Sequence, residues 1–432
     1  MIVRVKYIVA ILLLFTYTAN GQKITWYQHI APLIHSNCTP CHREGESAPF
    51  PLVTYEDVAK RAAFIKKVTQ SHYMPPWKAD PHYSTFANER KLSEEQITMI
   101  ADWADHKMPK GTATAKDENP YVTGTRYKRK PDLVLSMKES FHLPGDNTEK
   151  FIVYKIPFEL PDSMNVEAIE FTSNNRKVIH HANYEVDNVP ELDLYNTPAY
   201  VNNTESHLDY YEQYVKYRQN MVYFGGWIPG SSYESYPANI GWVMPKRGVV
   251  LLTVHYAPLG KDEDVISGVQ FFFTKTPVKR VIKAVSLGSG GIGEKQIDPY
   301  FYIPPNVVKS FKVRVATPTD QSLLYVWPHM HYLGKIFKAY AVTPEGDTIK
   351  LVSIPDWNFN WQEIYWFPKL MKIPAGTIVN IEGTYDNTAD NPSNPSSPPA
   401  IVYGAMKTKD EMMTLVMVSL PYEKGDEEIS TK

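Results

Sequence analysis

The stretch Val249-Val250-Leu251-Leu252-Thr253-Val254-His255-Tyr256 is a continuous apolar run, rich in β-branched residues and carrying a single histidine. Such a run is typical of a strand. Comparable runs recur from Pro131 onward, at Phe151–Ile156, Ile266–Phe273, Leu323–Trp327 and Met413–Leu420. Pro, Gly, Asn and Asp separate them, as in antiparallel sheets. We therefore predict that this part of the chain is all-β.

The β region is long enough for two sandwiches, which we expect to be antiparallel and jelly-roll-like. The glycine-rich stretch Leu287–Gly293 divides them, so we predict sandwiches at residues 131–286 and 287–422, followed by a polar tail at 423–432. Gly288–Gly293 looks superficially like a dinucleotide fingerprint. Because no βαβ pattern surrounds it, we interpret it as a loop.

Residues 22–111 have a different, helical pattern. Apolar residues at helical spacing follow Thr54, and Ser93-Glu94-Glu95-Gln96 is a capping box in sequence. We expect the helix after Ser93 to end before Pro109. Residues 112–130 are rich in threonine and charge and are predicted to be a linker. The fold class expected is a small all-α domain followed by two all-β sandwiches.

The first residues, 1–21, are predicted to be a signal peptide. Arg4 and Lys6 precede the apolar stretch Tyr7–Phe15, and Ala19-Asn20-Gly21 supplies the small residues of a cleavage site. About ten apolar residues fall short of the ~20 that a spanning helix needs. We therefore expect export to the periplasm and no membrane span after cleavage.

The composition is that of a globular protein with no electrostatic footprint for nucleic acid. The net charge of the 432 residues is −2, and 43% of them are hydrophobic. An exported chain is free to use disulfides, yet this one has two cysteines, Cys38 and Cys41. We expect no nucleic-acid partner.

Those two cysteines belong to Cys38-Thr39-Pro40-Cys41-His42. This spacing lets two thiols add to the vinyl groups of a haem while the adjacent imidazole reaches the iron. A redox dithiol would sit beside a βαβ pattern, and a zinc site would need a second group of ligands nearby; the sequence has neither. We predict one covalent haem c, attached through Cys38 and Cys41 and ligated by His42.

The helical region also resembles class I cytochrome c domains in its order of helix, Cys-x-x-Cys-His, middle helix, methionine loop and final helix. This resemblance implies that Met74, in Tyr73-Met74-Pro75-Pro76-Trp77, is the second axial ligand. Methionine–histidine ligation suits an electron carrier. Other candidates for this position are His72, Met99 and Met108.

Five histidines of the β region stand out. His329 and His331 are two residues apart, and on a strand such residues face the same side and can share a metal. His180 and His181 are adjacent, so sharing a metal there needs a bulge or a strand end. A lone strand histidine such as His255 is more often a hydrogen-bonded core residue.

Residues 130–422 resemble the copper type II, ascorbate-dependent monooxygenases, the family of peptidylglycine hydroxylating and dopamine β-monooxygenases. The matching motifs are Val178-Ile179-His180-His181, Val254-His255-Tyr256, His329-Met330-His331-Tyr332-Leu333-Gly334 and Asp410-Glu411-Met412. The resemblance implies two coppers that face each other across a wet cleft. His180, His181 and His255 would hold the electron-transfer copper, and His329, His331 and Met412 the oxygen-binding copper.

The chain departs from that family at its substrate contacts. An arginine that binds the peptide carboxylate precedes the family's His-x-His by two residues, where this chain has Trp327. The amidating enzyme also uses an asparagine and a tyrosine, two and four residues after its copper methionine. The corresponding residues here are Thr414 and Val416. Since the bidentate grip of arginine is missing, a glycine-extended peptide is a poor substrate candidate. The β region also lacks the disulfides of the animal enzymes.

The sequence therefore predicts an oxidoreductase, a copper monooxygenase that hydroxylates a C–H bond with O2 and receives electrons through its fused cytochrome. Its partners would be O2, an unknown small-molecule or peptide substrate and an upstream electron donor. The alternatives are a non-catalytic protein that binds copper or senses redox state, and a simple electron-transfer haem protein with fortuitous histidines.

Overall fold

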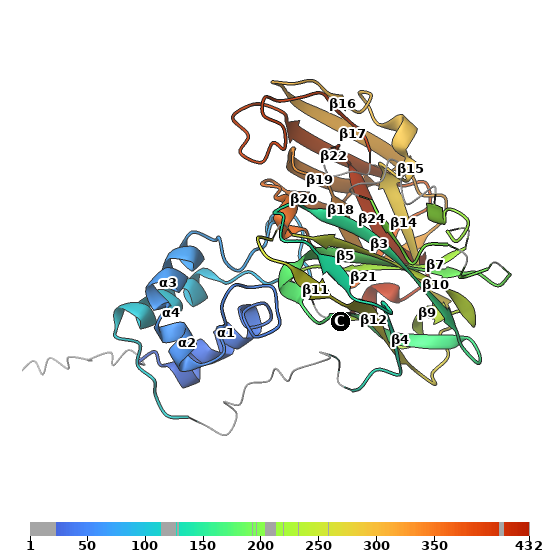
Figure 1. Cartoon of the computed structure of the whole chain (residues 1–432). Coiled ribbons are helices and arrows are strands. Elements are labelled where there is room, and N and C mark those ends of the chain that lie inside the picture. The colour runs from blue at the N-terminus through green and yellow to red at the C-terminus, as the bar shows by residue number, and fades with distance from the viewer. Residues whose placement is uncertain are drawn as a thin grey trace, which may run out of the picture.

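The structure, a computed structural model, describes residues 23–113, 127, 129–191, 193–195, 197–203, 213–218, 220–231, 233–257, 259–405 and 410–431. The expected signal peptide and most of the expected linker lie outside these residues. Figure 1 shows a group of helices at one side of a larger part built of antiparallel sheets. The prediction that the chain after Pro131 is β-rich is confirmed.

The helices come from the N-terminal region and enclose a core of their own. They are the π-helical turn η1 (Trp26–Ile30), α1 (Ala31–Asn37), α2 (Tyr55–Ala59), α3 (Ala62–Gln70) and α4 (Glu94–Asp105). Ser93 Oγ accepts from Gln96 N, and the Gln96 side chain accepts from Ser93 N, so the predicted capping box is confirmed. Trp26, Ile30, Ile100 and Trp103 are buried at the centre of this group.

The first pair of sheets shares one hydrophobic core. One sheet has the order β1 (Leu133–Ser136), β12 (Ser267–Phe273), β4 (Met164–Ser173), β9 (Ile240–Met244), β13 (Arg280–Val281), with β8 (Glu234–Ser235) on β4. The other has the order β6 (Tyr200–Asn202), β3 (Lys150–Glu159), β10 (Arg247–Tyr256), β5 (Ile179–Asn188), β7 (Met221–Trp227). The short strands β2 (Phe141–Leu143) and β11 (Glu263–Val265) pair beside them. The apolar run Val249–Tyr256 lies in β10, the middle strand of its sheet.

A second pair of sheets shares a second core. One has the order β15 (Ile292–Gly293), β14 (Lys283–Gly288), β24 (Thr414–Pro421), β18 (Gln321–His329), β21 (Tyr365–Ile373). The other has the order β17 (Val308–Ala316), β22 (Ile378–Asp386), β19 (Gly334–Val342), β20 (Thr348–Ile354), and β16 (Tyr302–Ile303) pairs with β23 (Val402–Tyr403). Short 3-10 turns are η2 (Arg176–Val178), η3 (Glu294–Gln296), η4 (Phe359–Trp361) and η5 (Asp426–Glu428). Of the predicted loop Gly288–Gly293, Gly288 ends β14 and Ile292–Gly293 form β15, so that residues 289–291 alone connect the two strands.

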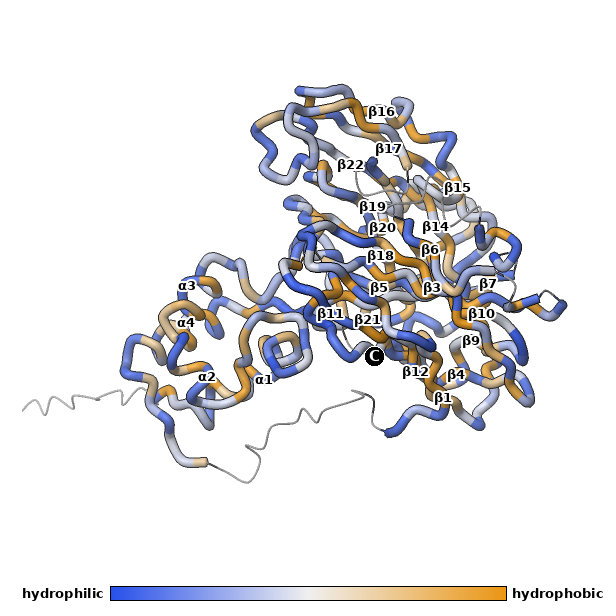
Figure 2. The backbone as a smooth tube through the Cα atoms, in the orientation of Figure 1, coloured by the Kyte–Doolittle hydropathy of each residue, from blue (hydrophilic) through white to orange (hydrophobic). Residues whose placement is uncertain are grey.

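The sheet that contains β18 and β24 is buried on both faces, and this joins the two pairs. Along β24, Leu415 and Met417 enter the second core, whereas Val416 and Val418 enter the first. Since successive side chains on a strand point to opposite faces, a strand between two cores must be apolar at nearly every position. This explains the apolar run Leu415–Val418. Figure 2 shows the hydrophobic strands at the centre of the β part.

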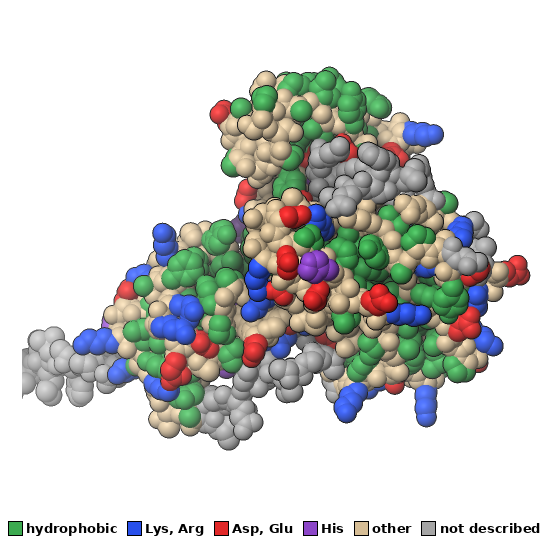
Figure 3. Space-filling view, viewed as in Figure 1, with side chains coloured by type: hydrophobic (Ala, Val, Ile, Leu, Met, Phe, Trp, Pro, Cys, Tyr) green, Lys and Arg blue, Asp and Glu red, His purple; other side chains and the backbone are tan. Residues whose placement is uncertain are grey.

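The surface carries no dominant charge on the face that Figure 3 shows, where Lys and Arg are interspersed with Asp and Glu. This fits the net charge of −2. Within the described residues, no helix is long and apolar enough to cross a membrane.

Candidate metal centres and haem-binding region

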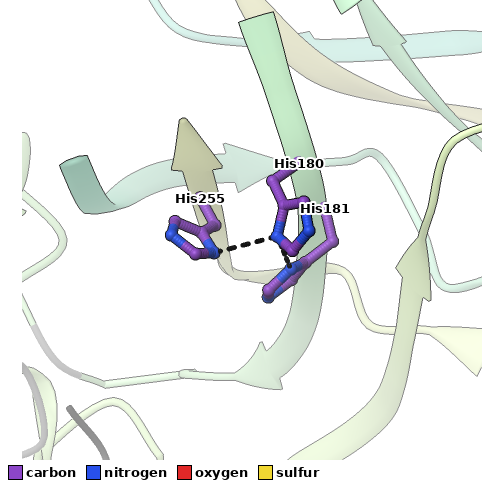
Figure 4. Close-up of side chains that lie close together, drawn as sticks. All are labelled: His180, His181 and His255. Carbon is purple, nitrogen blue, oxygen red and sulfur yellow. Dashed lines mark hydrogen bonds between the residues drawn. The ribbon is translucent and has the colours of Figure 1, made fainter. Parts of the chain in front are cut away.

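Three histidines converge from β5 and β10, as Figure 4 shows. His255 lies opposite His181 in the strand register, but Tyr256 lies opposite Ile179, so the ladder skips His180. This irregularity is a β-bulge, which turns both adjacent histidines toward one side. The sequence indicated that His180 and His181 need a bulge or a strand end to share a metal, and the structure has the bulge.

The imidazoles meet through their Nδ1 atoms. His180 Nδ1 lies 3.3 Å from His255 Nδ1 and 3.2 Å from His181 Nδ1. Within the described residues this is the one group of three or more His, Cys, Asp or Glu whose ligand atoms all lie within 4.8 Å of one another. Three nitrogens that converge in this way are a suitable donor set for a metal that takes imidazole, such as copper or zinc.

His180 and His181 are available as neutral ligands. Burial and the neighbouring His255 lower the pKa of His180 to about 3. Burial, followed by His255 and His180, also holds the pKa of His181 well below its usual value. Since a metal ligand must be a neutral imidazole, these rings need not lose a proton at neutral pH before binding.

His329, His331 and Met412 line one cavity. His329 Nδ1 donates to Gln362 Oε1 at 2.5 Å, and His331 Nδ1 donates to the Asp410 carbonyl at 2.9 Å. Because each Nδ1 is engaged as a donor, the lone pair of each imidazole is on Nε2. Hydrogen bonds of this kind fix the ring of a histidine that binds a metal through its other nitrogen, so both rings are oriented as metal ligands.

The buried carboxylate of Glu411 fixes the backbone around this second group. It accepts hydrogen bonds from His331 N at 2.9 Å, Leu333 N at 2.6 Å and Met412 N at 3.3 Å. The turn after β18 and the segment before β24 are thus held to each other, and Met412 is brought beside the two histidines.

A single phenyl ring, that of Phe359 in η4, stands between the two groups. Its centre lies 5.1 Å from the His180 ring and 5.8 Å from the His255 ring on one side. On the other side it lies 5.8 Å from the His331 ring and 4.4 Å from the Tyr332 ring. The resemblance implied a wet cleft between the sites. The Phe359 ring lines the cavity that His181 shares with His329 and His331.

Glu149 makes a second connection between the groups. One carboxylate oxygen lies 3.5 Å from His255 Nε2, and the other accepts a hydrogen bond from the Tyr332 hydroxyl. Tyr332 follows His331 directly in the chain. The acidic side chain therefore contacts a ligand candidate of the first group and a neighbour of the second.

The Cys38–His42 segment forms tight turns at the end of α1. Cys41 N and His42 N both donate to the Cys38 carbonyl, and His42 Nδ1 hydrogen-bonds the Phe50 carbonyl at 3.0 Å. This bond leaves the His42 Nε2 lone pair available to an iron. Burial, together with Cys41, raises the pKa of the Cys38 thiol to about 12, so Cys38 is a thiol in this structure.

Met74 is half-buried in the loop after α3, and its N–H donates to the Val68 carbonyl. Among the other candidates, Met99 and Met108 pack against the helical core, and exposed His72 lies 3.6 Å from Glu94. The role of Met74 as axial ligand stays a prediction.

An arm of the helical region, residues 77–90, lies on the second pair of sheets. Asp80 N donates to the Ser353 carbonyl at 2.8 Å, and Ala87 N donates to the Trp366 carbonyl at 2.7 Å. The Trp77 ring lies 5.3 Å from the Tyr365 ring, and Phe86 is buried in the second core. Nothing in the sequence pattern indicated that these residues leave the helical core for a sheet.

The arm ends at Arg90, which forms an ion pair with buried Glu363. Gly230, after β7, lies beside Cys41 and Arg90, because a Cβ added there would collide with Cys41 Sγ and approach Arg90 Nη1 to 2.6 Å. Arg176 also pairs with Glu46 at 2.8 Å. The Cys-x-x-Cys-His segment is therefore held against the β part at several points.

Comparisons with known proteins leave the family open. No family model matches the chain, and no curated protein does. A structure of PNGF-II aligns with 70% of this chain and 65% of that chain, at 10% identity and a TM-score of 0.27. The match thus spans less than two thirds of PNGF-II. Structures of infectious bursal disease virus, Gx and Gt strains, align with 69% of this chain and 72% and 82% of theirs, at 11% identity and TM-scores of 0.17 and 0.16. Likenesses this weak carry no argument about function.

Proposed function

We propose that this chain is an exported copper-dependent monooxygenase that receives electrons from a haem c bound to its own helical region. The observation that carries the proposal is the placement of two donor groups on either side of Phe359. His180, His181 and His255 form one, and His329, His331 and Met412 form the other. The family resemblance implies both groups from short motifs. The convergence of His180, His181 and His255, and the common cavity that His329, His331 and Met412 line, support them.

The two groups differ in their donor atoms, and this difference suits two coppers with different roles. The first offers imidazole nitrogens, which suit both oxidation states of copper. The second adds the thioether of Met412, which favours Cu(I), the form that reacts with oxygen. Bound copper would supply one-electron transfer at the first group and oxygen chemistry at the second.

The chain's own residues supply the orientation of the ligand candidates. Gln362 and the Asp410 carbonyl fix the rings of His329 and His331, and Glu411 fixes the backbone that carries Met412. The reaction consumes a substrate C–H bond, O2, two electrons and two protons, and yields the alcohol and water. The cavity that His329, His331 and Met412 line would hold the substrate.

The helical region would hold the haem through Cys38, Cys41 and His42, with Met74 as the other axial ligand. A haem bound there supplies one-electron transfer. Contacts of Cys41 with Gly230 and of Arg90 with Glu363 support a fixed delivery site, because they hold this region against the β part. Ile228, two residues before Gly230, lines the cavity.

The test is metal and haem analysis of the full chain from a periplasmic expression host that attaches haem. We expect one haem and two coppers per chain. His180→Ala and His329→Ala should each remove one copper, and His142→Ala, at an exposed site outside both groups, should remove none. Absence of copper in the unaltered protein would overturn the proposal.

A second measurement separates catalysis from mere copper binding. The reduced holoprotein is mixed rapidly with O2, with and without candidate substrates, and the haem spectrum and products are followed. A monooxygenase oxidises its haem in step with an alcohol product. Haem that stays reduced while copper is oxidised would favour a copper-binding or redox-sensing protein.

A further inference from the structure

The cavity beside the second donor group has a volume of about 580 Å³ and reaches from His181 to His329, His331 and Met412. Cavities of this size hold small organic molecules. Its walls come from both pairs of sheets, since β5 and β7 contribute one side and β14, β18 and β24 the other. The character of these walls decides which class of molecule fits.

Most of the wall is apolar and firmly packed. Trp327 replaces the arginine expected from the family resemblance, and it is 6% exposed. Its ring stacks on Phe224 at 5.9 Å, and Gly226 leaves the space that its indole fills, because a Cβ there would collide with it. The further apolar lining residues are Phe151, Met221, Ile228, Leu251, Ile292, Phe359 and Val416.

The formal charges on the wall cancel. Among the described lining residues, Glu185 and Arg218 are the ones that carry a formal charge at neutral pH, and they pair with each other. Arg218 Nε lies 2.9 Å and 3.0 Å from the two carboxylate oxygens, and Arg218 Nη2 lies 2.8 Å from Oε2. A carboxylate entering the cavity would have to displace Glu185 from Arg218 or remain uncompensated, and both are costly in a buried site.

Two polar atoms of lining residues are left for a ligand. Asn183 Oδ1 and Trp327 Nε1 are buried and have no hydrogen-bond partner among the described residues. Thr253, opposite Asn183 in the register of β5 and β10, also lines the cavity. Since a buried amide without a partner is unfavourable, a ligand that hydrogen-bonds there stabilises the complex.

We propose that the cavity selects uncharged, mainly apolar molecules of about two rings that carry a hydroxyl or amide group, and that it rejects carboxylates. As a statement about the substrate of the copper site, this rests on the function proposed above. The binding preference itself depends on the wall alone and needs no metal.

A matched pair of fluorescent probes tests the preference in the full-length protein. N-phenyl-1-naphthylamine is uncharged, and 8-anilino-1-naphthalenesulfonate has the same two ring systems with an added anion. Titration of metal-free and copper-loaded protein with each probe gives two dissociation constants. We expect the uncharged probe to bind at least ~10-fold more tightly, in line with the cost of a buried uncompensated charge.

Two variants make the wall of the cavity more positive and so test whether its charge causes the preference. Trp327→Arg places a cation in the wall, and Glu185→Gln removes the carboxylate that forms the ion pair with Arg218. Each should improve binding of the sulfonate by about 10-fold or more relative to the uncharged probe. Ile336→Arg, which adds the same charge at an exposed position of β19 outside the cavity, should leave the ratio unchanged. If Trp327→Arg does not fold, Glu185→Gln carries the test.

Equal affinity for the two probes, binding of neither, or the same change in Ile336→Arg would overturn the inference. Copper analysis remains independent of these titrations. A chain that binds no copper but prefers the uncharged probe would contradict the monooxygenase proposal and support the ligand class. A chain that binds two coppers but shows no preference between the probes would support the monooxygenase proposal and contradict the ligand class.

Discussion

The Tyr325 hydroxyl donates a hydrogen bond to Glu234 Oε2 at 3.3 Å, and this contact crosses from the second pair of sheets to the first. Glu234 is 4% exposed and also accepts from Tyr223 at 2.7 Å and from Tyr184 at 3.3 Å. A buried carboxylate is tolerated when several donors satisfy it. The junction between the sandwiches thus depends on one acid surrounded by phenols.

Removal of the acid should destabilise the fold more than removal of one donor. Glu234→Gln is expected to lower the free energy of unfolding by about 3 kcal/mol and Tyr325→Phe by about 1 kcal/mol. Urea denaturation of both variants measures this. Tyr340→Phe, whose hydroxyl bonds Glu382 on a half-buried face, is the control and should cost less. Equal effects of Glu234→Gln and Tyr340→Phe would contradict the buried-acid interpretation.

Loss of the Arg90–Glu363 ion pair should release the arm at residues 77–90. Glu363 is 7% exposed and the Arg90 side chain is half-buried, so Glu363→Gln removes the counter-charge of a half-buried guanidinium, at a cost of about 3 kcal/mol. Hydrogen exchange of peptides from the arm should accelerate at least tenfold, and electron transfer from haem to copper should slow.

The matched control for this prediction is Asp356→Asn. Lys78 of the same arm pairs with Asp356 at 2.6 Å, but the Asp356 side chain is 79% exposed, and such pairs contribute little. Exchange in the arm should stay at the rate of the unaltered protein. Release of the arm by Asp356→Asn, or none by Glu363→Gln, would count against a docking role for the buried pair.

Gln362 should control copper affinity at one group only. Gln362→Leu removes the acceptor that orients His329, and outer hydrogen bonds of this kind change metal affinity by about 10–100-fold. Competition with a chelator should show weaker binding of one copper and unchanged binding of the other. If both affinities fell together, the two groups would not be separate sites.

Asp426 should make folding stability depend on acid pH. Burial raises its pKa, but hydrogen bonds from Arg280 and Ser322 outweigh burial and lower the pKa to about 2. An unfolded aspartate titrates near ~3.9, so the interaction is fully present above about pH 5 and is lost as the pH falls toward 2. The expected contribution is about 2 kcal/mol.

The measurement is the free energy of unfolding from pH 6 to pH 2 for the unaltered chain and for Asp426→Asn. The variant should be less stable at pH 6, and the difference between the two proteins should shrink as the pH falls. A difference that stays constant with pH would show that Asp426 is not charged in the folded state.

Some features of the site followed from short stretches of sequence. The alternation of apolar runs with turn residues predicted the sheets, because strand formation depends on local spacing and on burial of one or both faces. The adjacency of His180 and His181 also showed that a shared metal requires a bulge, and the register at His255 has one. Both inferences concern neighbours in the chain.

Other features could not be read in this way. Phe359 stands between the donor groups, yet the segment around it matches no motif, and its partners His180 and His331 lie in other parts of the chain. Trp77 lies three residues after Met74 in the helical region, but its ring packs on Tyr365. An aromatic side chain gains similar free energy in either core, and the sequence near it does not distinguish them.

The sequence by itself determined the β-rich fold of the chain after Pro131, and its motifs proposed the ligands of a haem and two coppers. Only the tertiary structure decided how these parts meet. It decided that the pairing of β5 with β10 skips His180, that the ring of Phe359 lies between the groups, and that Glu363 contacts Arg90. The physical reason is that periodicity and short motifs record local geometry and burial. Contacts between residues hundreds of positions apart depend on which apolar faces pack together, and packing of that kind leaves no local pattern.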